Sequence, residues 1–183
     1  MSKVIRIYNS SDIQSRTLDR ITVTVRKVFG IPVSISNVSL NLQDIYDSGR
    51  EQYNSTALLA KILHTFDTKN NKSIVIVDED LFIPVLTFVF GEAQLDGSAA
   101  VVSTHRLKNQ YYGLQTNDQL MHERLEKEIV HELGHTFGLY HCRDYECVMK
   151  SSTYVEEIDL KMALPCKACR QFIVDYRNKH KSA

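Results

Sequence analysis

The chain has 183 residues, enough for one domain with a real core or for a main domain with a small appendage. Its 22 basic residues balance 22 acidic ones, so the overall charge gives no support for binding nucleic acid or an anionic membrane. No apolar run is long enough to cross a bilayer, and the first eight residues alternate like a strand rather than resembling a secretory signal. We therefore expect a cytoplasmic protein.

The first 80 residues alternate between strand and helix patterns. Apolar residues recur at helical spacing from Asp12 onward, and Gly30 followed by Pro32 ends that helix. The predicted elements are, in order, a strand at 3–8, a helix at 12–30, a strand at 32–40, a helix at 55–66 and a strand at 73–77. The last of these is a continuous apolar run, typical of a strand buried on both faces. This order predicts an α/β fold with a mostly parallel sheet.

The second half begins with two more extended stretches, predicted at residues 85–93 and 99–105. A helix then starts near Asn117 or Asp118 and continues through His135. Residues 139–165 show little periodicity. A last helix is predicted at about 167–180, with Phe172, Ile173 and Tyr176 on one side.

The most informative segment is His131-Glu132-Leu133-Gly134-His135, followed by Gly138 and His141. Residues four apart share one face of a helix, so His131 and His135 can present two imidazoles to one metal ion. A glycine can end the helix in a left-handed conformation, and the turn at Gly138 would bring His141 back as a third ligand. Three nitrogen ligands leave a fourth position open for water, as in a catalytic zinc site.

This arrangement predicts a peptide hydrolase. Zinc would lower the pKa of its bound water, and Glu132 would act as the general base that takes the proton and later gives it to the leaving amine. The other reading is a helix whose polar face happens to carry histidines. The remaining four histidines, His64, His105, His122 and His180, are predicted to be ordinary surface or half-buried residues.

All four cysteines lie in two clusters in the last third of the chain: Cys142 with Cys147, and Cys166 with Cys169. The two pairs together resemble a tetrahedral Cys₄ zinc site. Two disulfides or unrelated buried thiols are the alternatives. The clustering and the predicted cytoplasmic location favour zinc, so we expect two zinc ions in each chain.

The extended zinc motif, Cys142 directly after the third histidine, Cys147-Val148-Met149 and the later Cys-x-x-Cys together resemble the archaemetzincins, a family of metzincin zinc peptidases. The resemblance is strong over residues 131–169. It implies a mixed twisted sheet with helices above an active-site cleft, in an upper subdomain at 1–138. A small zinc-organised C-terminal subdomain would follow at 139–183, with Met149 as the Met-turn residue beneath the catalytic metal.

The resemblance also places an antiparallel edge strand of the sheet at residues 88–93, on the upper rim of the cleft, where an extended peptide could pair with it. The alternative is an interior strand with both edges already paired. Tyr154 does not match the spacing of an additional tyrosine ligand, so we treat it as a packing or surface residue.

Two other functions remain open. The first is a non-catalytic or very weakly active zinc-organised protein that binds peptides, although such a protein would have no use for Glu132 beside an open metal position. The second is an aminopeptidase, in which Glu92 or Asp96 would hold the terminal ammonium of the substrate. The expected partner is a peptide or protein substrate of a monomeric enzyme, without nucleic acid or membrane.

Overall fold

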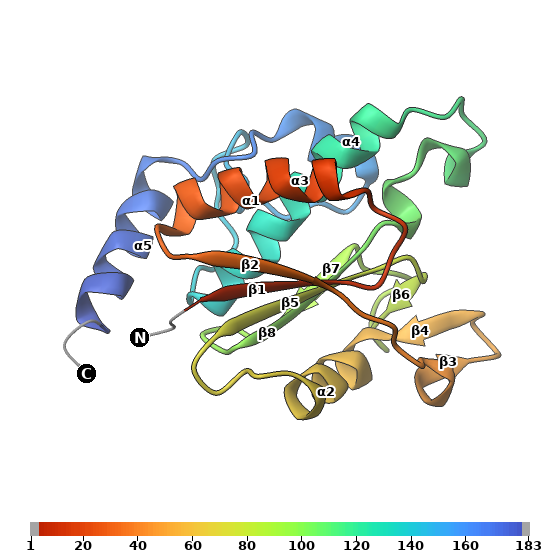
Figure 1. The fold of residues 1–183 in the computed structure, drawn as a ribbon. Helices are drawn as coiled ribbons and strands as arrows, with labels where there is room; N and C mark the ends of the chain where they lie inside the picture. The colour runs from red at the N-terminus through yellow and green to blue at the C-terminus, as the bar shows by residue number, and fades with distance from the viewer. Residues whose placement is uncertain (1–3, 181–183) are drawn as a thin grey trace.

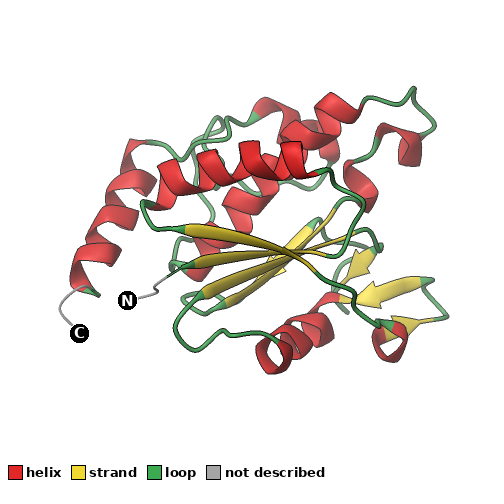
Figure 2. Ribbon diagram, viewed as in Figure 1, coloured by secondary structure: helices red, strands yellow, loops and turns green. Residues whose placement is uncertain are grey.

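A five-stranded sheet crosses the middle of the molecule (Figures 1 and 2). The computed structural model describes residues 4–180, so Lys3, which we predicted in the first strand, lies outside the described residues. The strand order is β2-β1-β5-β8-β7. The bounds are β1 Ile5–Asn9, β2 Val33–Asn37, β5 Lys72–Val77, β7 Gly91–Ala93 and β8 Ala99–Ser103. All neighbouring pairs are parallel except β7 with β8, which confirms the prediction of a mixed, mostly parallel α/β fold.

Helices cover both faces of this sheet (Figure 1). The helices α1 (Ser15–Phe29), α3 (Asp118–Thr136), α4 (Val155–Leu160) and α5 (Lys167–Lys179) lie on one side, and α2 (Ser55–Thr65) lies on the other. Gly30 ends α1 at φ 59°, the left-handed conformation that its sequence context predicts. The side chain of Asn117 caps α3 by accepting a hydrogen bond from the Leu120 amide at 3.0 Å.

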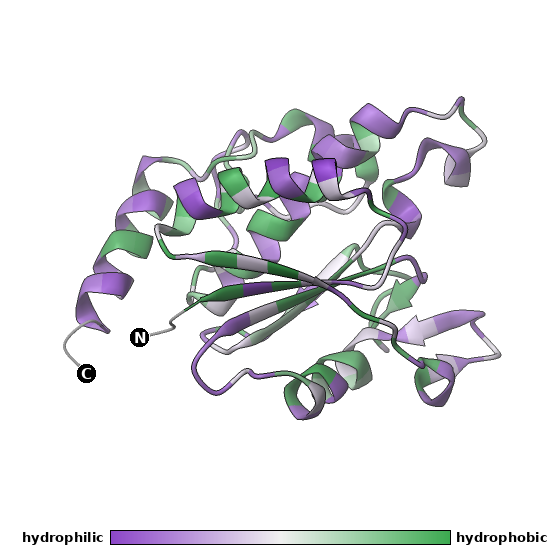
Figure 3. Cartoon of the chain, in the orientation of Figure 1, coloured by the Kyte–Doolittle hydropathy of each residue, from purple (hydrophilic) through white to green (hydrophobic). Residues whose placement is uncertain are grey.

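The sheet separates two hydrophobic clusters, and the hydrophobic residues of β1, β5 and β8 contribute to both because successive side chains point to opposite faces. Figure 3 shows hydrophobic segments along the strands and hydrophilic segments along the outer turns of α1 and α5. The larger cluster includes Val148, Ile158 and Ile173 together with residues of α1 and α3. The C-terminal residues thus share the main core, and a subdomain boundary after residue 138 stays a prediction.

Several parts of the fold differ from the expectation. Residues 85–93 do not form one strand: residues 84–88 make a turn, and β7 is only three residues long. The helix α4 was not predicted. In α5, Phe172 is 44% exposed whereas Ile173 is buried, so these two residues do not share the buried side of the helix as predicted. The short elements that the sequence did not reveal are β3 Tyr46–Asp47, β4 Gln52–Asn54, β6 Leu81–Phe82 and the 3₁₀ turns Gln43–Ile45, His105–Leu107 and Asn109–Tyr112. Across residues 4–180, none of the helices combines the length and apolarity that a bilayer span requires.

Candidate metal centre

The helix α3 and the turn after it bring three histidines together, as the sequence predicts. His131 and His135 are one helical turn apart on α3, and Gly138, at φ 84°, reverses the chain toward His141. One ring nitrogen from each of these residues, the histidine triad, lies within 4.8 Å of the other two. The rings of His131 and His141 lie 5.3 Å apart between centroids, and those of His135 and His141 lie 4.9 Å apart.

Backbone carbonyls fix the orientation of two of the three rings. The Nδ1 atom of His131 lies 2.8 Å from the carbonyl oxygen of Val148, and Nδ1 of His135 lies 2.7 Å from that of Leu139. A carbonyl oxygen can only accept, so both Nδ1 atoms carry the proton and both Nε2 atoms keep a lone pair. Burial lowers the pKa of His131 well below its ordinary value, so this ring stays neutral.

The two Nε2 lone pairs face each other at 3.1 Å. Without a proton between them they repel, and a cation between them removes the repulsion. Two nitrogens on a tetrahedral zinc ion, each about 2.1 Å from the metal, would lie roughly 3.4 Å apart. The triad therefore fits a zinc ion by donor type, tautomer and spacing, and its backbone partners are those expected around a metal-bound imidazole.

Glu132 lies beside the triad, buried to 5% exposure. Burial, reinforced by the charges of Glu128 and Glu92, raises the pKa of this carboxyl well above its ordinary value. Its carboxylate rests against the backbone of Gly91 in β7: a Cβ atom at Gly91 would come within 2.8 Å of Glu132 Oε1. This close approach places the carboxylate directly beside the edge strand of the sheet.

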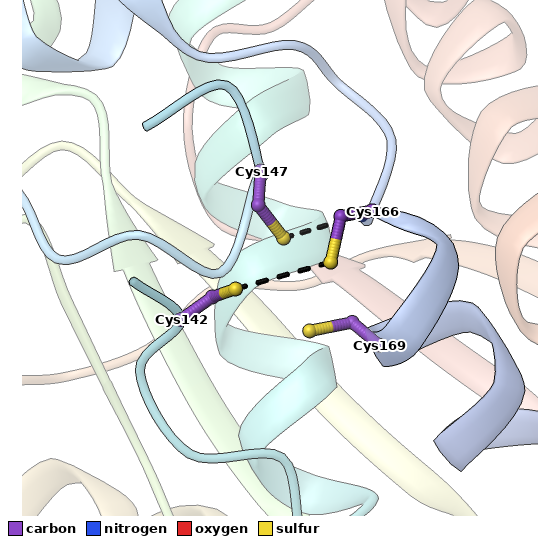
Figure 4. Close-up of side chains that lie close together, drawn as sticks. All are labelled: Cys142, Cys147, Cys166 and Cys169. Atoms are coloured by element: carbon purple, nitrogen blue, oxygen red, sulfur yellow. Dashed lines mark hydrogen bonds between the residues drawn. The ribbon is translucent and has the colours of Figure 1, made fainter. Parts of the chain in front are cut away.

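The four cysteines form a second cluster, with every sulfur within 4.8 Å of the others (Figure 4). Cys142 and Cys147 come from the segment after α3, while Cys166 and Cys169 come from the start of α5. None forms a disulfide. The Cys142 and Cys166 sulfurs are 3.9 Å apart, close to the roughly 3.8 Å expected between two thiolates on one tetrahedral zinc.

A bound cation would also favour the deprotonated, thiolate form of these cysteines. Burial raises the pKa of the Cys147 thiol to about 11, so this thiol stays protonated in the absence of a positive charge. The amide of Cys166 donates a hydrogen bond to the Cys147 sulfur at 3.3 Å, an interaction that favours a thiolate. The cluster is consistent with the predicted Cys₄ zinc site.

Met149 packs against α3 one residue before His135. It is fully buried, and a Cβ atom at Gly134 would come within 2.4 Å of its sulfur. Gly134 is the helical residue just before His135, so the absence of a side chain there lets Met149 pack against the helix at the metal centre. The predicted role of Met149, packing beneath the catalytic metal, stays a prediction.

One buried ion pair next to the triad was not predicted from the sequence. Lys161 donates to Glu128 at 3.0 Å, and each of the two side chains is at most 4% exposed. Lys161 also donates to the Lys150 carbonyl at 3.0 Å. Glu128 precedes His131 by three residues and Glu132 by four, so helical spacing alone places it on the same face of α3. Its partner, 33 residues away, left no signal in the sequence.

Two cavities flank the triad along β7. The Phe88 cavity, of about 250 Å³, is lined by residues 86–91, Glu128, His131, Glu132, His141 and residues 151–153. The Ala93 cavity, of about 340 Å³, is lined by residues 91–93, Leu95, His131, Glu132, His135, Tyr140 and His141. Together they form a cleft that runs past the triad and Glu132 beneath the edge strand.

The two carboxylates considered for an aminopeptidase already have protein partners. Glu92 accepts hydrogen bonds from the hydroxyls of Ser55 and Thr56 at the start of α2. Asp96 accepts one from the Tyr176 hydroxyl at 2.8 Å. Tyr154 is 66% exposed, in line with the surface role expected for it. The other four histidines lie outside both cavities and both clusters of candidate ligands.

Comparisons with known proteins agree with this geometry. The sequence profile of peptidase family M54 matches residues 43–174. An archaemetzincin from Methanocaldococcus jannaschii is 33% identical over 164 residues, which cover 90% of this chain and 89% of the relative. One from Natronomonas pharaonis is 36% identical over 153 residues, covering 82% and 87%.

Solved structures show the same likeness. The crystal structure of an archaemetzincin from Methanopyrus kandleri superimposes with a TM-score of 0.83 at 34% identity, over 96% of this chain and 95% of that one. That of an archaemetzincin from Archaeoglobus fulgidus, complexed with malonate, gives 0.76 at 31% identity, over 92% and 99%.

Proposed function

Because this chain belongs to the archaemetzincins, the zinc metallopeptidases of family M54, we propose that it hydrolyses peptide bonds at the histidine triad with Glu132 as general base. The observation that carries this proposal is the pair of Nε2 lone pairs facing each other at 3.1 Å beside a buried carboxylate. A site that only stabilised the fold would normally fill every metal position with protein ligands. Here the open side of the triad faces a cleft.

We assign His131, His135 and His141 as the ligands of the catalytic zinc, which when bound would polarise the scissile carbonyl and acidify water as a Lewis acid. Glu132 takes a proton from the attacking water on its carboxylate and later transfers that proton to the leaving amine. Gly91 leaves the space in which this carboxylate lies.

We assign Cys142, Cys147, Cys166 and Cys169 to a structural zinc. These residues connect the segment after α3 to the first turn of α5, across a stretch without long regular elements. A metal there would hold together residues that hydrogen bonding alone ties only loosely. Cys142 directly follows His141, so the structural site would also hold the third catalytic ligand in place.

The test of the general base is Glu132→Ala. We expect the variant to keep its fold and two zinc ions and to lose peptide hydrolysis by roughly 10²- to 10⁴-fold, the usual contribution of a positioned base. Glu123→Ala is the matched control, because Glu123 is on the same helix and, within residues 4–180, its carboxylate accepts a hydrogen bond from the Gln119 side chain alone. Unchanged hydrolysis in the Glu132 variant, with metal content measured on the same sample, would show that another group is the base.

We further propose that an extended substrate pairs with the free edge of β7. This strand is at the end of the sheet and, among the residues that the structure describes, pairs with β8 only. The Phe90 carbonyl and the Gln94 amide bond to β8, so the alternate residues Gly91 and Ala93 direct their backbone groups away from it. These groups lie along the cleft, which supports the expectation of a substrate-binding edge strand.

Ala93→Pro tests this mode of binding, since proline removes one outward donor without removing a bond to β8. We expect intact fold and zinc content with loss of peptide turnover. Val89→Pro is a poor test, because the Val89 amide donates to the Leu81 carbonyl at 2.9 Å and the substitution would disturb the fold itself. Normal cleavage by a folded Ala93→Pro variant would rule out pairing at this edge.

A further inference from the structure

The Phe88 cavity combines an aromatic wall with a charged floor. The rings of Phe88 and Phe90 meet edge to face, with centroids 5.2 Å apart, and both residues line the cavity. Glu128 lines it from α3, with only 3% of its surface exposed. A carboxylate buried beside aromatic rings costs free energy unless a partner compensates it.

Lys161 supplies that compensation only in part. It donates to one oxygen of Glu128, Oε1, at 3.0 Å. From residues 4–180 the structure gives no hydrogen bond to the second oxygen, Oε2. The ion pair is neutral as a whole, yet one strong acceptor at the floor of the cavity is left for a ligand. A ligand that donates a hydrogen bond there completes the coordination of a buried carboxylate.

The charges of Glu128, Glu132 and Lys161 determine which substrate side chain can enter the cavity and donate this hydrogen bond. A lysine or arginine of the substrate would bring a second cation next to Lys161, in a site where little water screens the repulsion. An aspartate or glutamate would be repelled by Glu128 and Glu132. A neutral side chain that carries a hydroxyl donor meets neither penalty, and the walls formed by Phe88 and Phe90 favour an aromatic ring above that hydroxyl.

The size agrees with this chemistry. A cavity of about 150 Å³ is enough to take up a benzene ring. The Phe88 cavity, at about 250 Å³, has room for a ring and its hydroxyl. It opens beside His131, Glu132 and His141, so a side chain inside it belongs to the residue next to the scissile bond.

We propose that the Phe88 cavity is a specificity pocket that selects tyrosine at the position flanking the scissile bond, through a hydrogen bond from the phenol to Glu128. This inference rests on the proposed peptidase function. It adds a substrate class to that function and makes the ion pair of Glu128 and Lys161 a determinant of specificity, beyond its structural role of joining α3 to the segment after α4.

The experiment uses four peptides that differ only at this position, which a peptide-library digest first locates: Tyr, Phe, Lys or Glu. A hydrogen bond to a charged group favours tyrosine by about 1.5 kcal/mol or more, so kcat/KM for the tyrosine peptide should exceed that for phenylalanine by roughly 10-fold. The lysine and glutamate peptides should be the poorest substrates. Equal kcat/KM for tyrosine and phenylalanine in the wild-type enzyme would overturn the proposal.

Variants separate specificity from stability. Glu128→Gln keeps the shape of the side chain but replaces the charged acceptor by a weaker, neutral one. The ratio of kcat/KM for the tyrosine peptide to that for the phenylalanine peptide should therefore fall several-fold. Should that variant unfold, the double variant Glu128→Met with Lys161→Met replaces the buried pair by apolar side chains, a change that proteins often tolerate, and its preference for tyrosine should disappear. Glu126→Gln is the matched control on the same helix, outside the cavity, and should keep the wild-type ratio. If the ratio of kcat/KM for the tyrosine peptide to that for the phenylalanine peptide were unchanged in the folded Glu128 variants, the ion pair would have a purely structural role and the proposal would be wrong.

A failure of the peptidase function would look different, because the zinc-loaded wild type would then cleave none of the four peptides. In that case the affinities of fluorescently labelled peptides for zinc-loaded Glu132→Ala decide the question. Tighter binding of the tyrosine peptide than of the phenylalanine peptide supports the pocket, and equal affinity refutes it.

Discussion

Gly138→Ala should weaken the catalytic metal site much more than it weakens the fold. Gly138 adopts φ 84°, and a Cβ atom there would meet nothing closer than 3.7 Å. The substitution therefore creates no clash, and its cost is that of a left-handed alanine, about 1–2 kcal/mol. Alanine also restricts the unfolded chain more than glycine does, and this effect offsets about 0.4–1 kcal/mol of the cost. The net loss should be about 1 kcal/mol, which for a domain of this size lowers Tm by roughly 2–4 °C.

This substitution should affect the metal affinity of the histidine triad more than it affects the stability of the fold. The residue after Gly138 is Leu139, whose carbonyl orients His135 through Nδ1, and His141 follows two residues later. Any change of φ at residue 138 toward negative values would move both the Leu139 carbonyl and His141. Displacing a hydrogen-bond partner of a metal ligand typically lowers metal affinity by about 10- to 100-fold. We expect that loss for the more weakly held of the two zinc ions, measured by competition with a chromophoric chelator.

Gly113→Ala provides the matched control. Gly113 is also left-handed, at φ 71°, and a Cβ atom there would have no neighbour within 4 Å. It lies in the loop before α3, away from both candidate zinc sites. Urea unfolding should show similar losses of stability for the two variants, with zinc affinity reduced only for Gly138→Ala. Equal zinc affinity in the two variants would refute the argument that the turn at Gly138 positions the site.

Two further predictions concern the second metal site and a buried lysine. Cys166→Ser should remove the zinc–sulfur component of the X-ray absorption spectrum and increase hydrogen exchange in residues 139–180; absence of that component in the wild type would exclude the Cys₄ site. Burial lowers the pKa of Lys72 from 10.5 to about 8. Between these values the unfolded chain keeps a proton on Lys72 that the folded chain has lost, so the free energy of unfolding should rise with pH by up to about 3 kcal/mol. Lys72→Met should flatten this dependence in urea titrations at pH 7.5 and 10, and identical slopes for the two proteins would contradict it.

Much of the fold is predictable because its long elements carry local signals. The helix α1 shows apolar spacing and ends at Gly30, and the buried strand β5 is a continuous apolar run. The candidate metal ligands are equally visible. Helical spacing joins His131 to His135, a glycine brings back His141, and the paired spacing of the cysteines points to a single cluster. In each case residues close in sequence determine the geometry.

The remainder depends on tertiary contacts. The strands β3 and β6 are only two residues long, too short for an alternating pattern to appear. The helix α4 has only six residues, and its start is marked by the Glu157 carboxylate, which accepts hydrogen bonds from the amides of Thr153 and Tyr154. The ion pair of Glu128 with Lys161 joins residues whose proximity only the folded chain creates. One face of α5 was misassigned because Phe172 and Ile173 are adjacent apolar residues, and spacing alone did not decide which is buried.

The free edge of β7 has a consequence for self-association. An edge that can accept a substrate peptide can accept any other extended chain, including a strand of a partly unfolded copy of this protein. Two features limit that hazard. The strand is only three residues long, so a paired copy would gain few hydrogen bonds. The chain turns at residues 84–87, and Val89 already pairs with Leu81, so the edge available to another chain is short. On the proposed binding mode, the same shortness would restrict backbone pairing by a substrate and leave the side-chain pockets to provide most of its affinity. Resistance to self-association and reliance on side-chain pockets would then be two results of a single short strand.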